Sequence, residues 1–144
     1  MSAAAQRAAV VAEAWTWINT PYHHHARVKG AGVDCAHLLC AVFEACELVP
    51  AIDPGNYAVD WHLHRSEEVF SGWLARYATE KVAGEPWQDG DVVLWRYGRT
   101  FSHGSIYVGN DQLIHSYTGR GVILSGRGEE PLAGQDTQHW SFWT

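Results

Sequence analysis

Apolar residues recur at helical spacing in three segments of the first half of the chain. They predict helices over Ala3–Ile18, Cys35–Leu48 and about Trp61–Tyr77. Pro21 ends the first helix, because proline cannot continue a helix. Asp34 is a good N-cap for the second, so Cys35 is expected to be its first residue.

After residue 84 the pattern changes to short runs rich in valine, isoleucine, leucine and aromatic residues, separated by turn signals. These runs predict strands over Asp91–Tyr97, Ser105–Val108, Gln112–Tyr117, Gly121–Leu124 and Gln138–Trp143. Helices therefore come first and strands second, which is typical of an α+β fold. We expect residues 1–144 to form a single domain.

Composition and charge exclude several classes of protein. Apolar residues make up 47% and charged residues 18% of the chain, which favours a globular fold over disorder. The formal net charge is −6 and basic residues are scattered, so no nucleic acid partner is expected. No apolar run is long enough to cross a bilayer, and the first residues do not form a signal peptide. We expect a protein that is cytoplasmic when made.

The three cysteines lie in one predicted helix, at positions 35, 40 and 46. Their spacing and direction along a helix do not suit a disulfide, so we expect three reduced thiols. Cys35 differs from the other two because it stands at the helix N-terminus. Unsatisfied N–H groups and the helix dipole favour a thiolate there, which makes Cys35 a candidate nucleophile.

A cysteine nucleophile needs a base, and two of the nine histidines are well placed to supply it. His103 and His115 lie on consecutive predicted strands, joined by the turn signal of residues 109–111. A three-residue loop would place residue 105 opposite residue 115. His103 and His115 would then be diagonal neighbours on one face, whereas a two-residue loop would place them on opposite faces.

The remaining histidines have simpler interpretations. His23, His24 and His25 form a polar run in a loop, and His62 and His64 fall on a predicted helix face beside glutamates. His37 is expected to point away from Cys35, and His139 has no evident partner. The eight tryptophans indicate either core packing or an aromatic cleft that Trp61, Trp73, Trp87 or Trp95 could line.

Five short motifs occur in an order that resembles the NlpC/P60 superfamily of papain-like cell-wall cysteine peptidases. They are Thr20-Pro21-Tyr22, Gly32-Val33-Asp34-Cys35, Gly90-Asp91-Val92-Val93, His103-Gly104-Ser105-Ile106-Tyr107-Val108-Gly109 and Leu113-Ile114-His115-Ser116. The chain looks most similar to the compact members associated with phage tails and phage-like particles. The match spans roughly Pro21 to Leu124, which is most of the chain.

The resemblance implies a papain-like fold in which the nucleophile helix packs on an antiparallel sheet. It implies that Cys35 is the nucleophile, His103 the base, His115 the residue that orients the base, and Tyr22 a helper at the oxyanion. Two departures concern substrate contacts. Ala36-His37 replaces the usual Ser-Gly after the cysteine, and the run at 23–25 replaces the usual Trp-Gly-Gly.

The function that the resemblance implies is hydrolysis of a peptide amide in peptidoglycan stem peptides, through a thioester, next to a D-γ-glutamyl residue and a diamino acid. No cofactor is expected. Three alternatives remain open: amidase or acyl-transfer chemistry with the same residues, zinc binding by Cys35 and the histidines, and a non-catalytic module of a phage-tail-like assembly. Metal-ligand spacings such as CxxC or HxxxH are absent from the sequence, which disfavours zinc.

Overall fold

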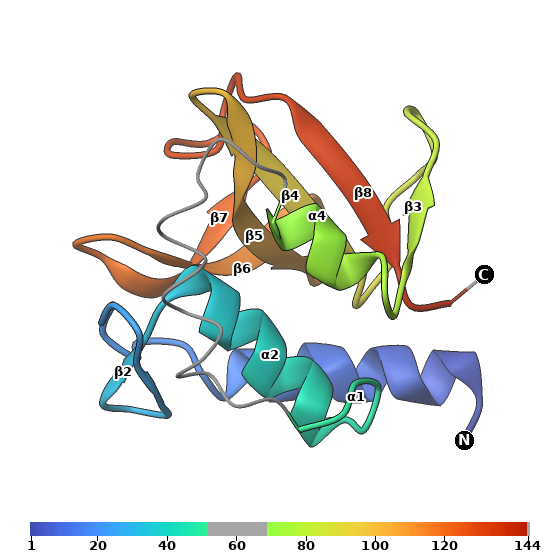
Figure 1. The fold of residues 1–144 in the computed structure, drawn as a ribbon, viewed down its shortest axis with the longest axis horizontal. Helices are drawn as coiled ribbons and strands as arrows, with labels where there is room; N and C mark the ends of the chain where they lie inside the picture. The colour runs from blue at the N-terminus through green and yellow to red at the C-terminus, as the bar shows by residue number, and fades with distance from the viewer. Residues whose placement is uncertain (52–68, 144) are drawn as a thin grey trace.

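The computed structural model describes residues 1–51 and 69–143. Two helices, α1 (Ala3–Trp15) and α2 (Cys35–Ala45), lie side by side against an antiparallel sheet (Figure 1). A short helix, α4 (Val69–Leu74), packs on the same sheet. None of the helices in these two ranges is long and apolar enough to span a bilayer.

The sheet has six strands in the order β3-β8-β4-β5-β6-β7, and each neighbouring pair is antiparallel. The strands are β3 (Thr79–Lys81), β4 (Val92–Tyr97), β5 (Thr100–Tyr107), β6 (Gln112–Tyr117), β7 (Gly121–Gly126) and β8 (Thr137–Ser141). A separate two-stranded hairpin, β1 (Arg27–Val28) and β2 (Gly32–Val33), precedes α2. The predicted helix-then-strand layout of a papain-like α+β fold is confirmed.

The sequence-based prediction missed three strands and misplaced some boundaries. Strands β1, β2 and β3 were missed because they are too short to leave a clear alternating pattern in the sequence. Strand β5 begins at Thr100 rather than at residue 105, so His103 lies inside a strand and not at its start. The third predicted helix lies partly outside the described residues, and its described part is a helix only over α4.

Alternation along the strands gives the sheet two different faces. Val92, Leu94, Ile106 and Ile114 point into the main core with the helices. A second cluster occupies the other face, made of Val93, Trp95, Tyr107, Leu113 and Leu132. Trp73 and Trp95 are almost fully buried, so for these two side chains the core-packing interpretation is correct.

Gly104 lets strand β5 approach the helices closely. A Cβ atom at this position would lie 2.6 Å from Phe70 and 2.7 Å from Leu39. Both distances are shorter than real Cβ contacts, so any side chain at this position would push the strand away from α2 and α4. The glycine therefore brings His103, its neighbour in sequence, close to the N-terminus of α2.

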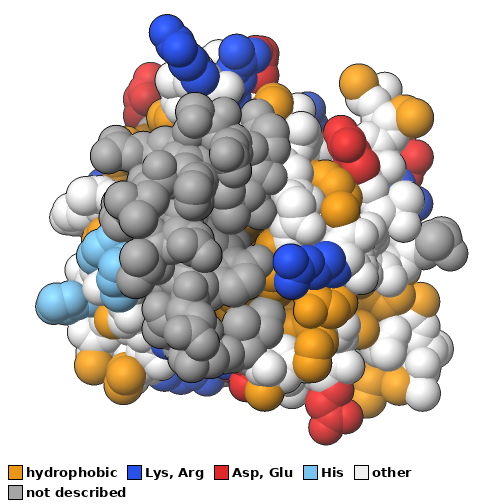
Figure 2. All heavy atoms as spheres, in the orientation of Figure 1, with side chains coloured by type: hydrophobic (Ala, Val, Ile, Leu, Met, Phe, Trp, Pro, Cys, Tyr) orange, Lys and Arg blue, Asp and Glu red, His pale blue; other side chains and the backbone are white. Residues whose placement is uncertain are grey.

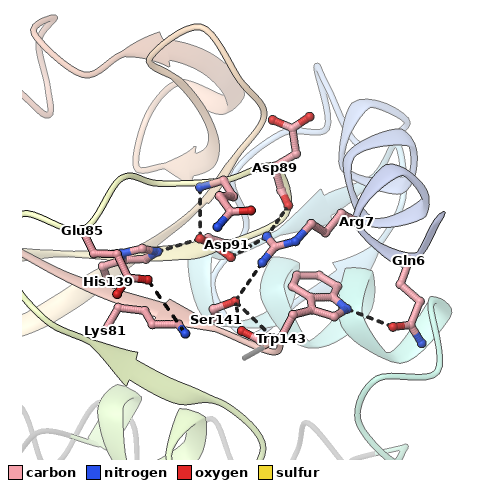
Figure 3. A network of polar contacts seen from close by, with 10 residues as sticks. Gln6, Arg7, Lys81, Glu85, Asp89, Asp91, His139, Ser141 and Trp143 are labelled. Carbon is pink, nitrogen blue, oxygen red and sulfur yellow. Dashed lines mark hydrogen bonds and ion pairs between the residues drawn. The ribbon is translucent and has the colours of Figure 1, made fainter. Parts of the chain in front are cut away.

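A buried ionic network joins helix α1 to strands β4 and β8 (Figure 3). The Asp91 carboxylate lies 2.8 Å from the Arg7 guanidinium and 2.6 Å from Nε2 of His139. Arg7 also donates to the Asp89 carbonyl and to Ser141. His139 therefore has a buried partner, contrary to the expectation from sequence. The reason is that β8 pairs with β4 inside the sheet, which brings His139 to Asp91.

We predict that Asp91→Asn lowers the free energy of unfolding by about 2–4 kcal/mol, because it leaves Arg7 without its buried counter-charge. Denaturant unfolding followed by circular dichroism measures the change. Asp136→Asn is the matched control, since Asp136 is exposed and 3.8 Å from Arg96, and it should change stability by less than about 0.5 kcal/mol. Equal effects of the two substitutions would show that burial does not set the strength of the Asp91 contacts.

Candidate active site

Cys35 is the first residue of α2, as the sequence predicted. Asp34 caps the helix in an extended conformation, and its side chain accepts from the backbone N–H of His37. The Cys35 thiol faces strand β5, where Sγ donates to the carbonyl of Ser102 over 3.9 Å. All three cysteines are free thiols, which confirms the expected absence of a disulfide among them.

The β5–β6 hairpin has the register that the two histidines need. Ile106 pairs with Ile114 and Tyr107 with Leu113, so residue 105 falls opposite residue 115. The three loop residues Gly109, Asn110 and Asp111 all have positive φ, at 94°, 54° and 57°. The structure therefore has the three-residue loop of the two alternatives, and His103 and His115 share a face.

The two histidine rings are in direct contact. Nε2 of His103 lies 2.7 Å from Nδ1 of His115, and both residues are buried. The far nitrogen of His115, Nε2, lies 2.8 Å from Oγ of Ser125 on β7. If His103 keeps Nδ1 free as an acceptor, Nε2–H of His103 donates to His115, and Nε2–H of His115 donates to Ser125.

Ser125 is a site residue that the sequence analysis missed. It lies on β7, where it pairs with Leu113, so it sits diagonally across from His115. In the sequence, Ser125 directly follows a predicted strand. Serine is common in the turns that follow strands, so this position alone does not indicate a functional role. Only the pairing of β6 with β7 shows that its hydroxyl meets an imidazole.

Cys35 and His103 line one pocket of about 270 Å³. The other lining residues carry hydroxyl groups: Tyr22, Tyr97, Ser102, Ser116, Tyr117 and Thr118. The expected nucleophile and base thus share a cavity that a substrate can enter. No tryptophan is among these described lining residues, so the aromatic-cleft interpretation is not supported for Trp73 or Trp95. Trp87 lines a separate pocket with Arg127 and His139, and Trp61 lies outside the described residues.

Two tyrosines hold the ring of His103 in place. Tyr97 and Tyr117 pack edge-on against it, with ring centroids 5.7 and 5.6 Å away. The Tyr97 hydroxyl donates to the carbonyl of Pro131, which fixes the tyrosine to the loop between β7 and β8. Neither tyrosine was singled out in the sequence, because aromatic residues are common in strands.

Tyr22 lies at the wall of the same pocket, as the sequence predicted. Its backbone forms a short bridge with Val33, next to the start of α2. Burial, and after it the negative charge that Cys35 carries when ionised and the charge of Asp34, raise the pKa of the Tyr22 hydroxyl, while a hydrogen bond with Thr118 lowers it. The hydroxyl is therefore a proton donor at neutral pH.

The Cys35 thiol and the His103 imidazole are both neutral at rest, which corrects the expectation of a thiolate. Burial, and after it the Asp34 carboxylate, raise the pKa of Cys35 to about 12. Hydrogen bonds from the backbone N–H groups of Gly104 and Ala36 lower the pKa of Cys35, but their effect is smaller than that of burial and Asp34. Burial and the neighbouring His115 lower the pKa of His103 to about 3, so its imidazole is a neutral acceptor.

The outer surface near this site also carries histidines. His23, His24 and His25 are exposed, and histidine side chains gather on the side where β1 and β2 lie (Figure 2). Within residues 1–51 and 69–143, no group of three or more histidine, cysteine or acidic side chains is arranged to hold a metal ion. The zinc alternative therefore has no support from this part of the chain.

Curated proteins that share sequence with this chain include a murein hydrolase and a probable endopeptidase. The murein DD-endopeptidase MepS/murein LD-carboxypeptidase of Escherichia coli is 50% identical over 40 residues, which cover 28% of this chain and 21% of that protein. A probable endopeptidase NlpC homolog of Haemophilus influenzae is 28% identical over 122 residues, covering 85% of this chain and 55% of that protein. The chain therefore spans between about a fifth and about half of the length of these relatives.

Solved structures share the fold at low sequence identity. The NlpC/p60 domain of the peptidoglycan hydrolase SagA superposes with a TM-score of 0.61 at 21% identity, covering 92% of this chain and 96% of that one. NlpC2 from Trichomonas vaginalis gives a TM-score of 0.69 at 16% identity, covering 98% of this chain and 49% of that one. The NlpC/P60 family model matches residues 19–141, which include α2 and strands β5 and β6. Fold, motif order and this match together show that the chain belongs to the NlpC/P60 family.

Proposed function

We propose that this chain is a cysteine peptidase that hydrolyses amide bonds in the stem peptides of peptidoglycan. The observation that carries the proposal is that Cys35 and His103 line one pocket while His115 contacts the far nitrogen of His103 at 2.7 Å. This is the nucleophile, base and orienter arrangement of acyl-transfer enzymes. The family match and the murein endopeptidase relative support the substrate class.

Because the thiol and the imidazole are both neutral at rest, proton transfer accompanies attack. The Cys35 thiol gives its proton to Nδ1 of His103 while the sulfur bonds to the substrate carbonyl carbon. The resulting imidazolium is stabilised by its contact with His115, whose own ring is held by Ser125. A neutral thiol and a neutral imidazole thus give rise to charge, on the imidazolium and on the substrate oxyanion, only when substrate is bound.

Collapse of the tetrahedral intermediate breaks the carbon–nitrogen bond. The imidazolium of His103 returns its proton to the leaving amine, and a thioester remains on Cys35. Water then attacks the thioester with His103 again as base, which releases the carboxylic acid product and restores the thiol. Tyr22 and the backbone N–H of Cys35 are the donors that we assign to the oxyanion in both steps.

The finer specificity also belongs to this proposal. We assign the cleaved bond to the one between a D-γ-glutamyl residue and a diamino acid, on the resemblance of the sequence motifs to the family. The setting in a phage tail or phage-like particle, and action at the wall after synthesis in the cytoplasm, remain predictions from the same resemblance. Digestion of purified peptidoglycan followed by mass analysis of the fragments identifies the bond, and an added amine acceptor separates hydrolysis from acyl transfer.

We expect Cys35→Ala and His103→Ala each to reduce the release of peptidoglycan fragments by at least about 10³-fold, because they remove the nucleophile and the base. Thermal unfolding confirms that each variant folds. Cys46→Ala is the matched control, since Cys46 is a second thiol at the other end of α2, and it should retain wild-type activity. Full activity of Cys35→Ala would overturn the proposed function.

His115→Ala should lower kcat by a smaller factor, about 10- to 100-fold, with little change in KM, because it removes the orienting contact and leaves the base. His115→Asn should recover part of this loss, since its amide can still accept from Nε2 of His103. Steady-state kinetics on a soluble stem-peptide fragment measures both. A His115→Ala variant as inactive as His103→Ala would mean that His115 does more than orient the base.

The pKa values predict activity that persists in mild acid. Histidine ordinarily titrates near 6.5. The lowered pKa of His103, about 3, keeps its imidazole unprotonated and able to accept a proton as the pH falls to 5. We expect kcat/KM to change less than about threefold between pH 7 and pH 5. The unfolded chain takes up protons on His103 and His115 below pH 6.5 and the folded chain does not, so stability declines in the same range. Circular dichroism at each pH therefore accompanies the rates, and an acid limb near pH 6.5 in a folded enzyme would contradict the assignment.

A further inference from the structure

The N-cap of α2 places a carboxylate next to the proposed nucleophile. Asp34 precedes Cys35 and is buried, and its charge acts against a negative charge on the Cys35 sulfur. The reaction nevertheless requires negative charge on that sulfur during attack. A group that offsets the Asp34 carboxylate would therefore make the attack easier.

His37 is in the position to offset that charge. Its Nδ1 atom lies 2.8 Å from Oδ1 of Asp34, and both side chains are buried. His37 is the third residue of α2, and side chains three apart lie on the same side of a helix. Because the partner is a carboxylate, Nδ1 carries the proton and donates it.

The Asp34 carboxylate is fully engaged by this arrangement. Oδ1 also accepts from the backbone N–H of His37 at 2.9 Å, and Oδ2 accepts from the backbone N–H of His25 at 2.9 Å. Burial alone would raise the pKa of Asp34, yet the hydrogen bonds and charge of His37 lower it below its usual value. The carboxylate is thus held ionised and turned toward His37.

We propose that His37 is a positioning residue for catalysis, which holds the Asp34 carboxylate as the helix cap and offsets its charge beside the Cys35 sulfur. The inference deepens the proposed function and rests on Cys35 being the nucleophile. His37 does not touch the reacting atoms. It acts through Asp34, so its removal should weaken the nucleophile without removing it.

Other titratable groups near this pair belong to the same region of the fold. Among the described residues, the charge of Asp34 acts on Cys35, Cys40 and Tyr22, and the backbone N–H of His25 donates to Asp34. The effect of His37 on the reactivity of the Cys35 sulfur is therefore best measured in a double-mutant cycle in which Asp34 is the second substituted residue.

The experiment measures the rate at which iodoacetamide alkylates Cys35, residue by residue, by peptide mass spectrometry between pH 7 and pH 9. It needs no substrate, and only the thiolate reacts. A change of one unit in the pKa of the thiol changes the thiolate fraction about tenfold and, because nucleophilicity changes in the opposite sense, the rate about three- to fourfold. We expect His37→Ala to lower the Cys35 rate about three- to tenfold across this range. The rate at Cys46 in the same sample is the internal control and should not change.

Three further variants separate charge compensation from a structural role. His37→Asn places an amide N–H where Nδ1 stands and should keep the rate within about twofold of the wild type. Asp34→Asn keeps the cap, because asparagine caps as well as aspartate, and removes the charge. In that background His37→Ala should have no effect on the rate, which is the coupling that a double-mutant cycle detects.

Two results would overturn the role of His37: an unchanged Cys35 rate in folded His37→Ala, or an equal loss with and without the Asp34 charge. If His37→Ala does not fold, His37→Leu fills the buried volume and replaces it in the cycle. Failure of this inference is distinct from failure of the proposed function. Loss of activity in Cys35→Ala together with an unchanged alkylation rate in the His37 variants would leave the peptidase standing and remove only the role of His37.

Discussion

The register of the β5–β6 hairpin is the constraint on which the rest of the site depends. Ile106 and Ile114 pair in the main core, and the alternation of side chains then puts His103 and His115 together on the other face. A shift of one residue would exchange core and site on one of the two strands. The burial of Ile106 and Ile114 therefore fixes the register of the hairpin, and the register in turn holds the imidazoles of His103 and His115 in contact.

Burial has a second consequence, which concerns charge. The same environment that fixes the rings keeps both the thiol and the imidazole neutral, with pKa values of about 12 for Cys35 and about 3 for His103. Helix N-termini favour a thiolate, but here desolvation and the Asp34 carboxylate are stronger. The chain from His103 through His115 to Ser125 then matters because it receives the positive charge that appears when the thiol loses its proton.

The N-terminus of α2 has to satisfy two demands at one place. The helix needs a cap with oxygen acceptors, and Asp34 supplies it; the nucleophile at Cys35 needs an environment that tolerates negative charge. The contact between Asp34 and His37 reconciles the two, because the carboxylate keeps its N–H donors while an imidazole donates to it. His37 thus links the capping of α2 by Asp34 to the reactivity of the Cys35 thiol.

The sequence by itself determined the α+β layout, the cap at Asp34, the start of the helix at Cys35 and the turn at residues 109–111, since each depends on residues close together in the chain. The structure decided the parity of that turn, on which the shared face of His103 and His115 depends. It could not show Ser125, Tyr97 or Tyr117 at the site, the Asp91 partner of His139, or the neutral state of Cys35. Those features arise where strands and helices distant in sequence pack together and exclude water. Contacts and desolvation of that kind are properties of the tertiary structure and leave no periodic pattern in the chain.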